Sequence, residues 1–182
     1  MSLAVIVQGP IGSGKTETCR ELSDLVRAKG YRTGGVLCPR AFSGGEMVGY
    51  DAVEPASGER WPVARLSRLV EGPGWFSHGH LIFSFSKVGL DRANRYLASS
   101  AAEMGTGSFV FVDEFGRLER AKAGIYEGAH KVAGGLLRGG VAVFLCRADC
   151  VDDVSKLVRS MAGRTLVFEP GDASAIWNGL KL

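Results

Sequence analysis

The sequence predicts an α/β fold of three layers, in which helices cover both faces of a mostly parallel central sheet and a β-hairpin is inserted. Apolar runs typical of buried strands alternate with amphipathic segments typical of helices. The first apolar run passes directly into a glycine-rich loop, and that loop into the first amphipathic segment. The segment at about 41–88 lacks this alternation, so we expect a single domain over residues 1–182 with an insertion there.

The first predicted unit is a strand, a loop and a helix. Residues 3–7 are apolar throughout, as in a strand buried on both faces. After the loop, apolar residues recur at helical spacing and Gly30 supplies a stop, which predicts a helix over 15–29. Residues 31–38 then form a second predicted strand, closed by Pro39.

The insertion begins with a predicted hairpin. Segments 47–53 and 60–63 flank the turn-rich connector 54–59. Residues 71–80 resemble a loop with an unusual density of aromatic residues, and the apolar run 81–83 follows. Long loops in compact domains are often functional, but a hairpin that only covers a sheet edge fits the pattern equally well.

The rest of the chain repeats the alternation of helix and strand. We expect a helix from Leu90 to near Gly105, a strand over 109–112, a helix ended by Gly139-Gly140, a strand over 141–146, a helix capped by Asp149, a strand over 165–168 and a helix from about Ala173. The carboxyl ends of parallel strands share one edge of the sheet, where ligands bind. The glycine-rich loop and several charged residues fall at such ends, which indicates a single site: Arg40, Asp113, Glu114 and Arg147.

Composition and charge limit the partners. The formal net charge of +3 is about what a polyphosphate site needs for itself, so it indicates no nucleic acid or membrane partner. The start of the chain has no basic signal-like segment and no apolar run is long enough to span a membrane, so we expect a cytoplasmic protein. We also expect a monomer. The four cysteines lack metal-site spacing and are expected to be reduced thiols. The three histidines form no metal-ligand pattern either.

The glycine-rich loop has the form G-x-x-x-x-G-K-[ST], which predicts a phosphate-binding loop. Consecutive backbone N–H groups and a helix N-terminus bind polyphosphate, and glycines allow the close approach. In this pattern Lys15 reaches the β and γ phosphates and the Thr16 hydroxyl is a ligand of Mg²⁺. The predicted nucleotide-binding residues are Gly9, Pro10, Ile11, Gly12, Ser13, Gly14, Lys15, Thr16 and Glu17.

Two adjacent carboxylates follow the strand at 109–112. Asp113 stands where P-loop enzymes place the acidic residue that holds Mg²⁺. Glu114 is positioned to activate a water beside the γ phosphate, although the same residue can bind a helix end. An adjacent pair of this kind favours hydrolysis over transfer to another acceptor.

Phosphoryl transfer also needs positive charge beyond Lys15 and the metal. Arg147, at the end of the strand 141–146, is the preferred candidate, so the predicted catalytic residues are Lys15, Glu114 and Arg147. Arg117 and Arg120 are alternatives for this charge, and Arg32 and Arg40 for contacts with the base or a second substrate.

With these residues the chain resembles the THEP-type, or cancer-related, nucleoside-triphosphatase family of the P-loop class. The segment 113–119 is similar to the family's D-E-[IV]-G-x-[ML]-E signature, and 143–147 to its later strand ending in arginine. Further similar segments are the phosphate loop, 32–35, 49–51 and 57–60. Two departures are Phe115 for an aliphatic residue and the loop proline at position 10 rather than one later.

The resemblance implies slow, Mg²⁺-dependent hydrolysis of ATP, GTP and other nucleoside triphosphates, with loose base selectivity. It assigns Asp113 to the metal and Glu114 to the water. Two other functions stay open from the residues alone. One is a small-molecule kinase with its acceptor in 41–88, suggested by Trp75 and Phe76, and the other is a nucleotide-dependent protein-binding switch.

Overall fold

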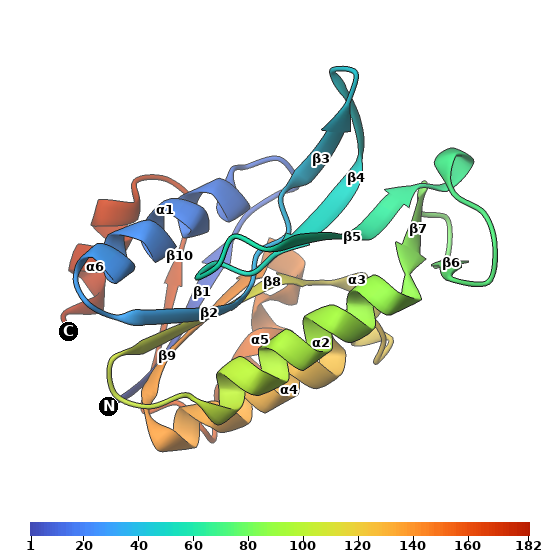
Figure 1. Ribbon diagram of the computed structural model, residues 1–182. Coiled ribbons are helices and arrows are strands. Elements are labelled where there is room, and N and C mark those ends of the chain that lie inside the picture. Colours follow the sequence, from blue (N-terminus) through green and yellow to red (C-terminus); the bar gives the residue numbers. More distant parts are fainter.

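Two sheets make up the computed structural model, which describes residues 1–182 (Figure 1). The central sheet has the strand order β10-β1-β9-β8-β2, and all of its neighbours pair in parallel. Its strands are β1 Ser2–Gln8, β2 Arg32–Val36, β8 Ser108–Phe115, β9 Gly140–Cys146 and β10 Arg164–Phe168. This parallel sheet confirms the α/β fold class predicted above.

Helices cover both faces of the central sheet, as predicted. One face carries α1 Lys15–Ala28 and α6 Ala173–Leu180, and the other carries α2 Lys87–Ala102, α4 Tyr126–Gly135 and α5 Val151–Val158 (Figure 1). Side chains alternate along a strand, so β1 sends Val5 into the α1–α6 core and Ile6 into the core on the other face. The continuous apolar run of β1 therefore reflects burial on both faces.

The predicted cap of α5 is wrong. Asp149 lies inside the 3₁₀ turn Ala148–Cys150, and α5 begins after Cys150 without a side-chain cap. The Asp149 carboxylate instead pairs with Arg147 and Arg120. The Asp149 carboxylate that the sequence pattern predicts as the cap of α5 therefore forms salt bridges with two nearby arginines instead.

The insertion is a complete antiparallel sheet rather than a hairpin alone. Its strand order is β3-β4-β5-β7-β6, with β3 Arg40–Ser43, β4 Glu46–Val53, β5 Arg60–Leu66, β6 Trp75–Ser77 and β7 Phe83–Ser86. The predicted hairpin corresponds to β4 and β5. The strands β3, β6 and β7 have only three or four residues each, too few for an alternation to stand out from a loop.

The second sheet projects from the carboxyl end of β2 and packs on α2 (Figure 1). Trp61 on β5 donates from Nε1 to the Gly89 carbonyl oxygen at 3.0 Å and stacks on Tyr96, with ring centroids 4.9 Å apart. An isolated bridge between Leu37 and Val53 links the two sheets. These contacts hold the insertion over the edge where the central strands end.

Three further short helical segments complete the chain: the 3₁₀ turn Ser67–Leu69 after β5, α3 Arg117–Arg120 after β8, and the 3₁₀ turn Leu136–Arg138 that extends α4 to Gly139. No helix in the fold is both long and apolar enough to cross a bilayer.

Candidate active site

The phosphate loop connects β1 to α1 and depends on its glycines. Gly12 and Gly14 have φ angles of 82° and 89°, in the left-handed region that L side chains rarely adopt. At Gly9 an added Cβ would lie 2.7 Å from the Ser13 Oγ atom. Gly12 and Gly14 are therefore glycine because of their backbone conformation, and Gly9 leaves room for the Ser13 side chain.

Lys15 is folded back over this loop. Its Nζ atom donates to the carbonyl oxygens of Gly9 and Pro10, both at 2.9 Å, and the residue is buried. The ammonium group thus lies at the centre of the loop, held by backbone acceptors rather than by a carboxylate.

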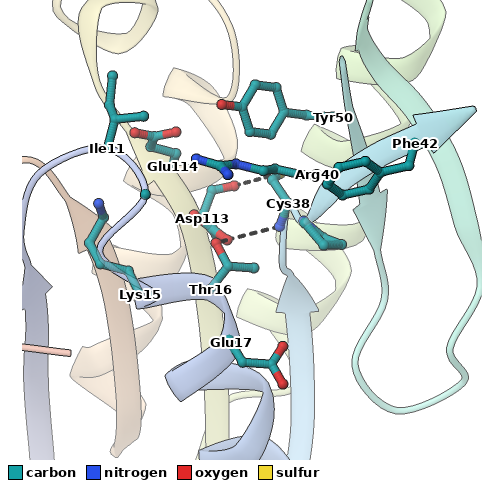
Figure 2. Close-up of a pocket in the computed structure, with 13 residues that line it drawn as sticks. Ile11, Lys15, Thr16, Glu17, Cys38, Arg40, Phe42, Tyr50, Asp113 and Glu114 are labelled. Atoms are coloured by element: carbon teal, nitrogen blue, oxygen red, sulfur yellow. Dashed lines mark hydrogen bonds between the residues drawn. The ribbon is translucent and has the colours of Figure 1, made fainter. Parts of the chain in front are cut away.

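Asp113 joins the phosphate loop to the central sheet. Its Oδ2 atom accepts from the Thr16 hydroxyl at 2.8 Å and from the Cys38 backbone N–H at 2.9 Å (Figure 2). Burial, with a further contribution from the charge of Glu114, raises the pKa of Asp113 to about 7. Thr16 and Asp113, the two predicted metal ligands, are therefore in direct contact.

A bulge at the end of β8 turns both acidic side chains into one cavity. Asp113 pairs with Leu145 and Phe115 with Cys146, so Glu114 has no register partner on β9. In a regular strand, adjacent side chains point to opposite faces. Here Asp113 and Glu114 both line a cavity of about 370 Å³ together with the phosphate loop.

The antiparallel sheet places an arginine in the same cavity. Arg40, the first residue of β3, extends across the cavity toward Glu114 (Figure 2), and its Nη2 atom lies 3.0 Å from the position of a Cβ on Gly12. Tyr50, its register partner on β4, also lines the cavity. Burial and the charge of Glu114 raise the pKa of the Tyr50 hydroxyl, and Arg40 opposes that shift.

Arg147, the predicted catalytic arginine, does not line the phosphate cavity. The chain turns into the 3₁₀ segment directly after β9, and Asp149 accepts a hydrogen bond from Arg147 Nε at 3.1 Å. Arg147 and Arg117 instead line a neighbouring cavity that also contains Glu114. Arg120 pairs with Asp153 at 2.7 Å.

Sequence reasoning did not resolve which arginine faces the loop, because the position of Arg40 depends on how the insertion folds back. Arg32, by contrast, begins β2 and so lies at the opposite end of the sheet from the phosphate loop. Tyr50 belongs to the segment 49–51 of the family resemblance, but one aromatic residue in a hairpin gives no functional signal of its own.

Glu119, the last carboxylate of the segment 113–119, has a structural role. One of its oxygens accepts from the Gly116 N–H at 2.8 Å and the other from the Ile125 N–H at 2.9 Å. Burial raises the pKa of Glu119 to about 7, although these hydrogen bonds oppose the shift. The carboxylate closes the turn around α3, and Gly124 leaves room for it, since a Cβ there would overlap Glu119 Oε1.

The remaining polar candidates form no site. No group of three or more His, Cys, Asp or Glu side chains has the arrangement of a metal centre. The four cysteines are unpaired, as predicted, and three of them are buried.

The glycine-rich loop between β1 and α1, with Asp113 hydrogen-bonded to its threonine, defines an α/β P-loop protein. More narrowly, the chain belongs to the NTPase family, because the family model described as NTPase matches residues 4–137. This agrees with the family resemblance found in the sequence.

Relatives named nucleoside-triphosphatase THEP1 match part of the chain. The protein from Methanopyrus kandleri is 30% identical over 115 residues, which are 63% of this chain and 58% of that protein. The protein from Methanothermobacter thermautotrophicus is 25% identical over 117 residues, 64% of this chain and 62% of its own length. The matched part thus spans about three fifths of each of these relatives.

Two solved structures share the fold over nearly the whole chain. A human cancer-related nucleoside triphosphatase superposes with a TM-score of 0.70 at 17% identity, covering 99% of this chain and 97% of that one. THEP1 from Aquifex aeolicus gives a TM-score of 0.68 at 16% identity, with 99% of each chain covered. At these identities the likeness concerns the fold alone.

Proposed function

We propose that the protein is a nucleoside-triphosphate phosphohydrolase that cleaves the γ phosphate of ATP, GTP and other nucleoside triphosphates. The observation that carries the proposal is that Glu114 and the phosphate loop line one cavity. A carboxylate beside a bound γ phosphate has the position that a general base for water requires. The names of the similar proteins from Methanopyrus and Methanothermobacter agree with this activity.

Residues 9–17 are proposed to hold the triphosphate through backbone N–H groups and the N-terminus of α1. Lys15 exchanges its backbone acceptors at Gly9 and Pro10 for phosphate oxygens. Since a lysine paired with carbonyl oxygens holds no carboxylate partner, no ion pair has to break when the nucleotide binds.

Mg²⁺ is the proposed cofactor, and the residues fit it. The Thr16 hydroxyl and the Asp113 carboxylate, 2.8 Å apart, are hard oxygen donors, and Mg²⁺ is commonly bound by one or two such groups together with substrate phosphates. When bound, the ion neutralises charge on the phosphate oxygens. Asp113 is held in place by the Cys38 N–H, so the donor pair is already oriented.

In the proposed reaction Glu114 takes a proton from water while the water oxygen bonds to the γ phosphorus. The bond from that phosphorus to the bridging oxygen breaks, and the nucleoside diphosphate leaves with the electron pair. Lys15 and Arg40 line the cavity in which negative charge develops. Arg40 is our preferred source of the additional charge, and Arg147 the alternative.

The decisive experiment replaces Glu114 by Gln. We expect nucleotide binding to remain and steady phosphate release to fall by about 10²–10⁴-fold. Glu21→Gln, on the exposed face of α1, is the control and should behave as the wild type. Unchanged phosphate release in Glu114→Gln would reject Glu114 as the base.

The range of substrates and the metal are tested together. Phosphate release from a panel of nucleoside triphosphates, with and without Mg²⁺, should show little base selectivity and a strict need for the ion. We further propose that residues 1–182 act as one domain and as a monomer in the cytoplasm, with no membrane or nucleic acid partner, consistent with a net charge of only +3.

A further inference from the structure

A second cavity, of about 240 Å³, adjoins the phosphate cavity and shares Glu114 with it. We call it the apolar chamber. Its walls come from the antiparallel sheet and from the segment after β8, and they include Ala64, Phe83, Phe85, Leu118 and Ile125. Its volume lies just below the ~300–1,000 Å³ of typical ligand sites, so an occupant must be small.

The polar groups of the apolar chamber gather where it meets the phosphate cavity. Asp113 and Glu114 line both cavities, and Arg117 and Arg147 line only the chamber. Asp149 engages Arg147 through Nε alone, and Arg117 forms no salt bridge. The chamber therefore combines an apolar wall, the two carboxyl groups that it shares with the phosphate site, the buried Glu119 carboxyl group and two guanidinium groups.

A nucleobase fits this place poorly. If the phosphate loop holds the triphosphate as proposed, Glu114 lies at the γ phosphate, and the base lies at the other end of the nucleotide. Glu114 lines the chamber, whereas Gly12, Gly14, Lys15 and Thr16 line only the phosphate cavity. With Glu114 at the γ phosphate, we therefore place the chamber next to that phosphate. An occupant there would stand in line to accept the phosphoryl group.

We propose that the apolar chamber binds a second substrate, a small alcohol with an apolar or aromatic body and an anionic group, and that this alcohol accepts the γ phosphoryl group. The inference rests on the proposed binding of a nucleoside triphosphate at the phosphate loop. Glu114 takes the hydroxyl proton and the alcohol oxygen bonds to the γ phosphorus. The bond to the bridging oxygen breaks, giving a phosphate monoester and a nucleoside diphosphate.

The arginines and the walls have separate tasks in this proposal. Arg117 and Arg147 bind the anionic group of the alcohol, and the apolar side chains pack against its apolar or aromatic body. Water is the acceptor when the chamber is empty, so the two activities share one carboxylate.

The test uses three probes with the full chain, ATP and Mg²⁺: benzyl alcohol and the meta and para isomers of (hydroxymethyl)benzoate. Phosphorus NMR detects a phosphate monoester, and calorimetry with a non-hydrolysable ATP analogue measures probe binding. We expect saturable binding and ester formation at millimolar concentrations, with at least one benzoate binding tighter than benzyl alcohol. The methyl ether of that benzoate should compete for binding but give no ester.

Leu81→Trp fills the chamber from its rim, and Ile82→Trp, at the neighbouring exposed position, is the matched control. We expect Leu81→Trp to lose at least tenfold in ester formation, with ATP affinity and probe-free hydrolysis unchanged. Ile82→Trp should match the wild type. Arg117→Ala should weaken binding of the benzoates but not of benzyl alcohol.

The outcomes separate the two proposals. If wild-type protein hydrolyses ATP but none of the three probes binds or is phosphorylated, the second-substrate chamber is rejected and the hydrolase stands. If Leu81→Trp weakens ATP binding, the chamber holds the nucleobase and the inference fails. If probes bind and accept phosphate but no hydrolysis occurs without them, the hydrolase proposal fails and the chamber stands.

Discussion

The two sheets of this protein contribute in different ways to one site. The parallel sheet supplies the phosphate loop, Asp113 and Glu114, and its three central strands β1, β8 and β9 are buried on both faces. The antiparallel sheet supplies Arg40 and Tyr50 and part of the chamber wall, and many of its residues are partly exposed. The proposed polyphosphate site therefore belongs to the core, and the insertion supplies much of the surface that faces the proposed acceptor.

This difference predicts a division between stability and activity. Changes within the parallel sheet should act mainly on the free energy of unfolding, since its side chains form the two apolar cores. Changes to site residues of the antiparallel sheet should act mainly on turnover. Substitutions in the two sheets test that division.

Gly35→Ala should be the most destabilising change. Gly35 on β2 has a φ angle of 91°, and an added Cβ would overlap the Phe111 carbonyl oxygen in the neighbouring strand. Neither backbone can move without breaking the ladder, so we expect a loss of about 4 kcal/mol or more in unfolding free energy. Chemical denaturation followed by circular dichroism measures it.

Gly134→Ala in α4 is the control for this substitution. A Cβ there meets nothing within 4 Å, so this variant should gain about 0.5–1 kcal/mol from the helix propensity of alanine. A Gly35→Ala protein as stable as the wild type would contradict the close approach of β2 and β8.

Arg40→Ala should lower the turnover number for phosphate release by about 10²–10³-fold, the loss usual for removing one transition-state donor. Its stability should change little, because the guanidinium forms no salt bridge in the structure. Arg68→Ala, an exposed arginine beyond β5, is the control and should turn over normally. Steady-state kinetics with ATP and Mg²⁺ gives the comparison.

Arg147→Ala tests the alternative directly. Because Arg147 lines only the chamber, its loss should reduce hydrolysis much less than the loss of Arg40. If Arg147→Ala lowered hydrolysis more than Arg40→Ala, Arg147 would be the arginine that stabilises the developing charge, as the sequence pattern predicts.

The fold was largely predictable because its central sheet follows simple rules. The apolar runs at 3–7 and 109–112 correspond to β1 and β8, and the glycine-rich loop lies between β1 and α1 as its motif requires. The acidic pair was placed correctly beside the loop, since parallel strands end at one edge.

The sequence placed Arg40 at the edge of the site, but that Arg40 rather than Arg147 faces the phosphate loop was not predictable, and neither was the second sheet, for a shared physical reason. Arg40 reaches the phosphate loop only because β3 pairs with β4 and turns back over the site. Such pairing joins residues from short strands, whose local pattern is weak. The bulge at Glu114 also left no trace in the sequence, and it aims the side chain into the cavity.

Glu119→Gln should destabilise the protein by about 2 kcal/mol at pH 5.5. The Gly116 and Ile125 N–H groups each need an acceptor, and an amide offers one oxygen where the carboxyl offers two. This residue lies beside the site without forming part of the phosphate cavity, so nucleotide binding by the folded variant should persist. Thermal unfolding at several pH values measures the effect.

The same variant should change the pH dependence of stability. The pKa of Glu119 is about 7 in the fold and about 4.5 unfolded, so the unfolded chain releases its proton first as pH rises. The stabilisation that the raised pKa of Glu119 gives the wild type is therefore complete below pH 4.5 and is lost as pH rises to about 7. The difference in unfolding free energy between wild type and Glu119→Gln should narrow from pH 5.5 to 8. A constant difference would exclude the raised pKa of Glu119.

Trp61→Phe tests how firmly the insertion is attached and should have the smallest effect, about 1–2 kcal/mol. The indole N–H donates to the buried Gly89 carbonyl oxygen, and phenylalanine keeps the stacking on Tyr96 while removing that donor. If the antiparallel sheet is held to α2 as a separate layer, hydrogen exchange should rise in β5 and β7 but not in β1 or β9. Uniform acceleration across both sheets would mean that they unfold as one unit, and stability could then not be assigned to the parallel sheet alone.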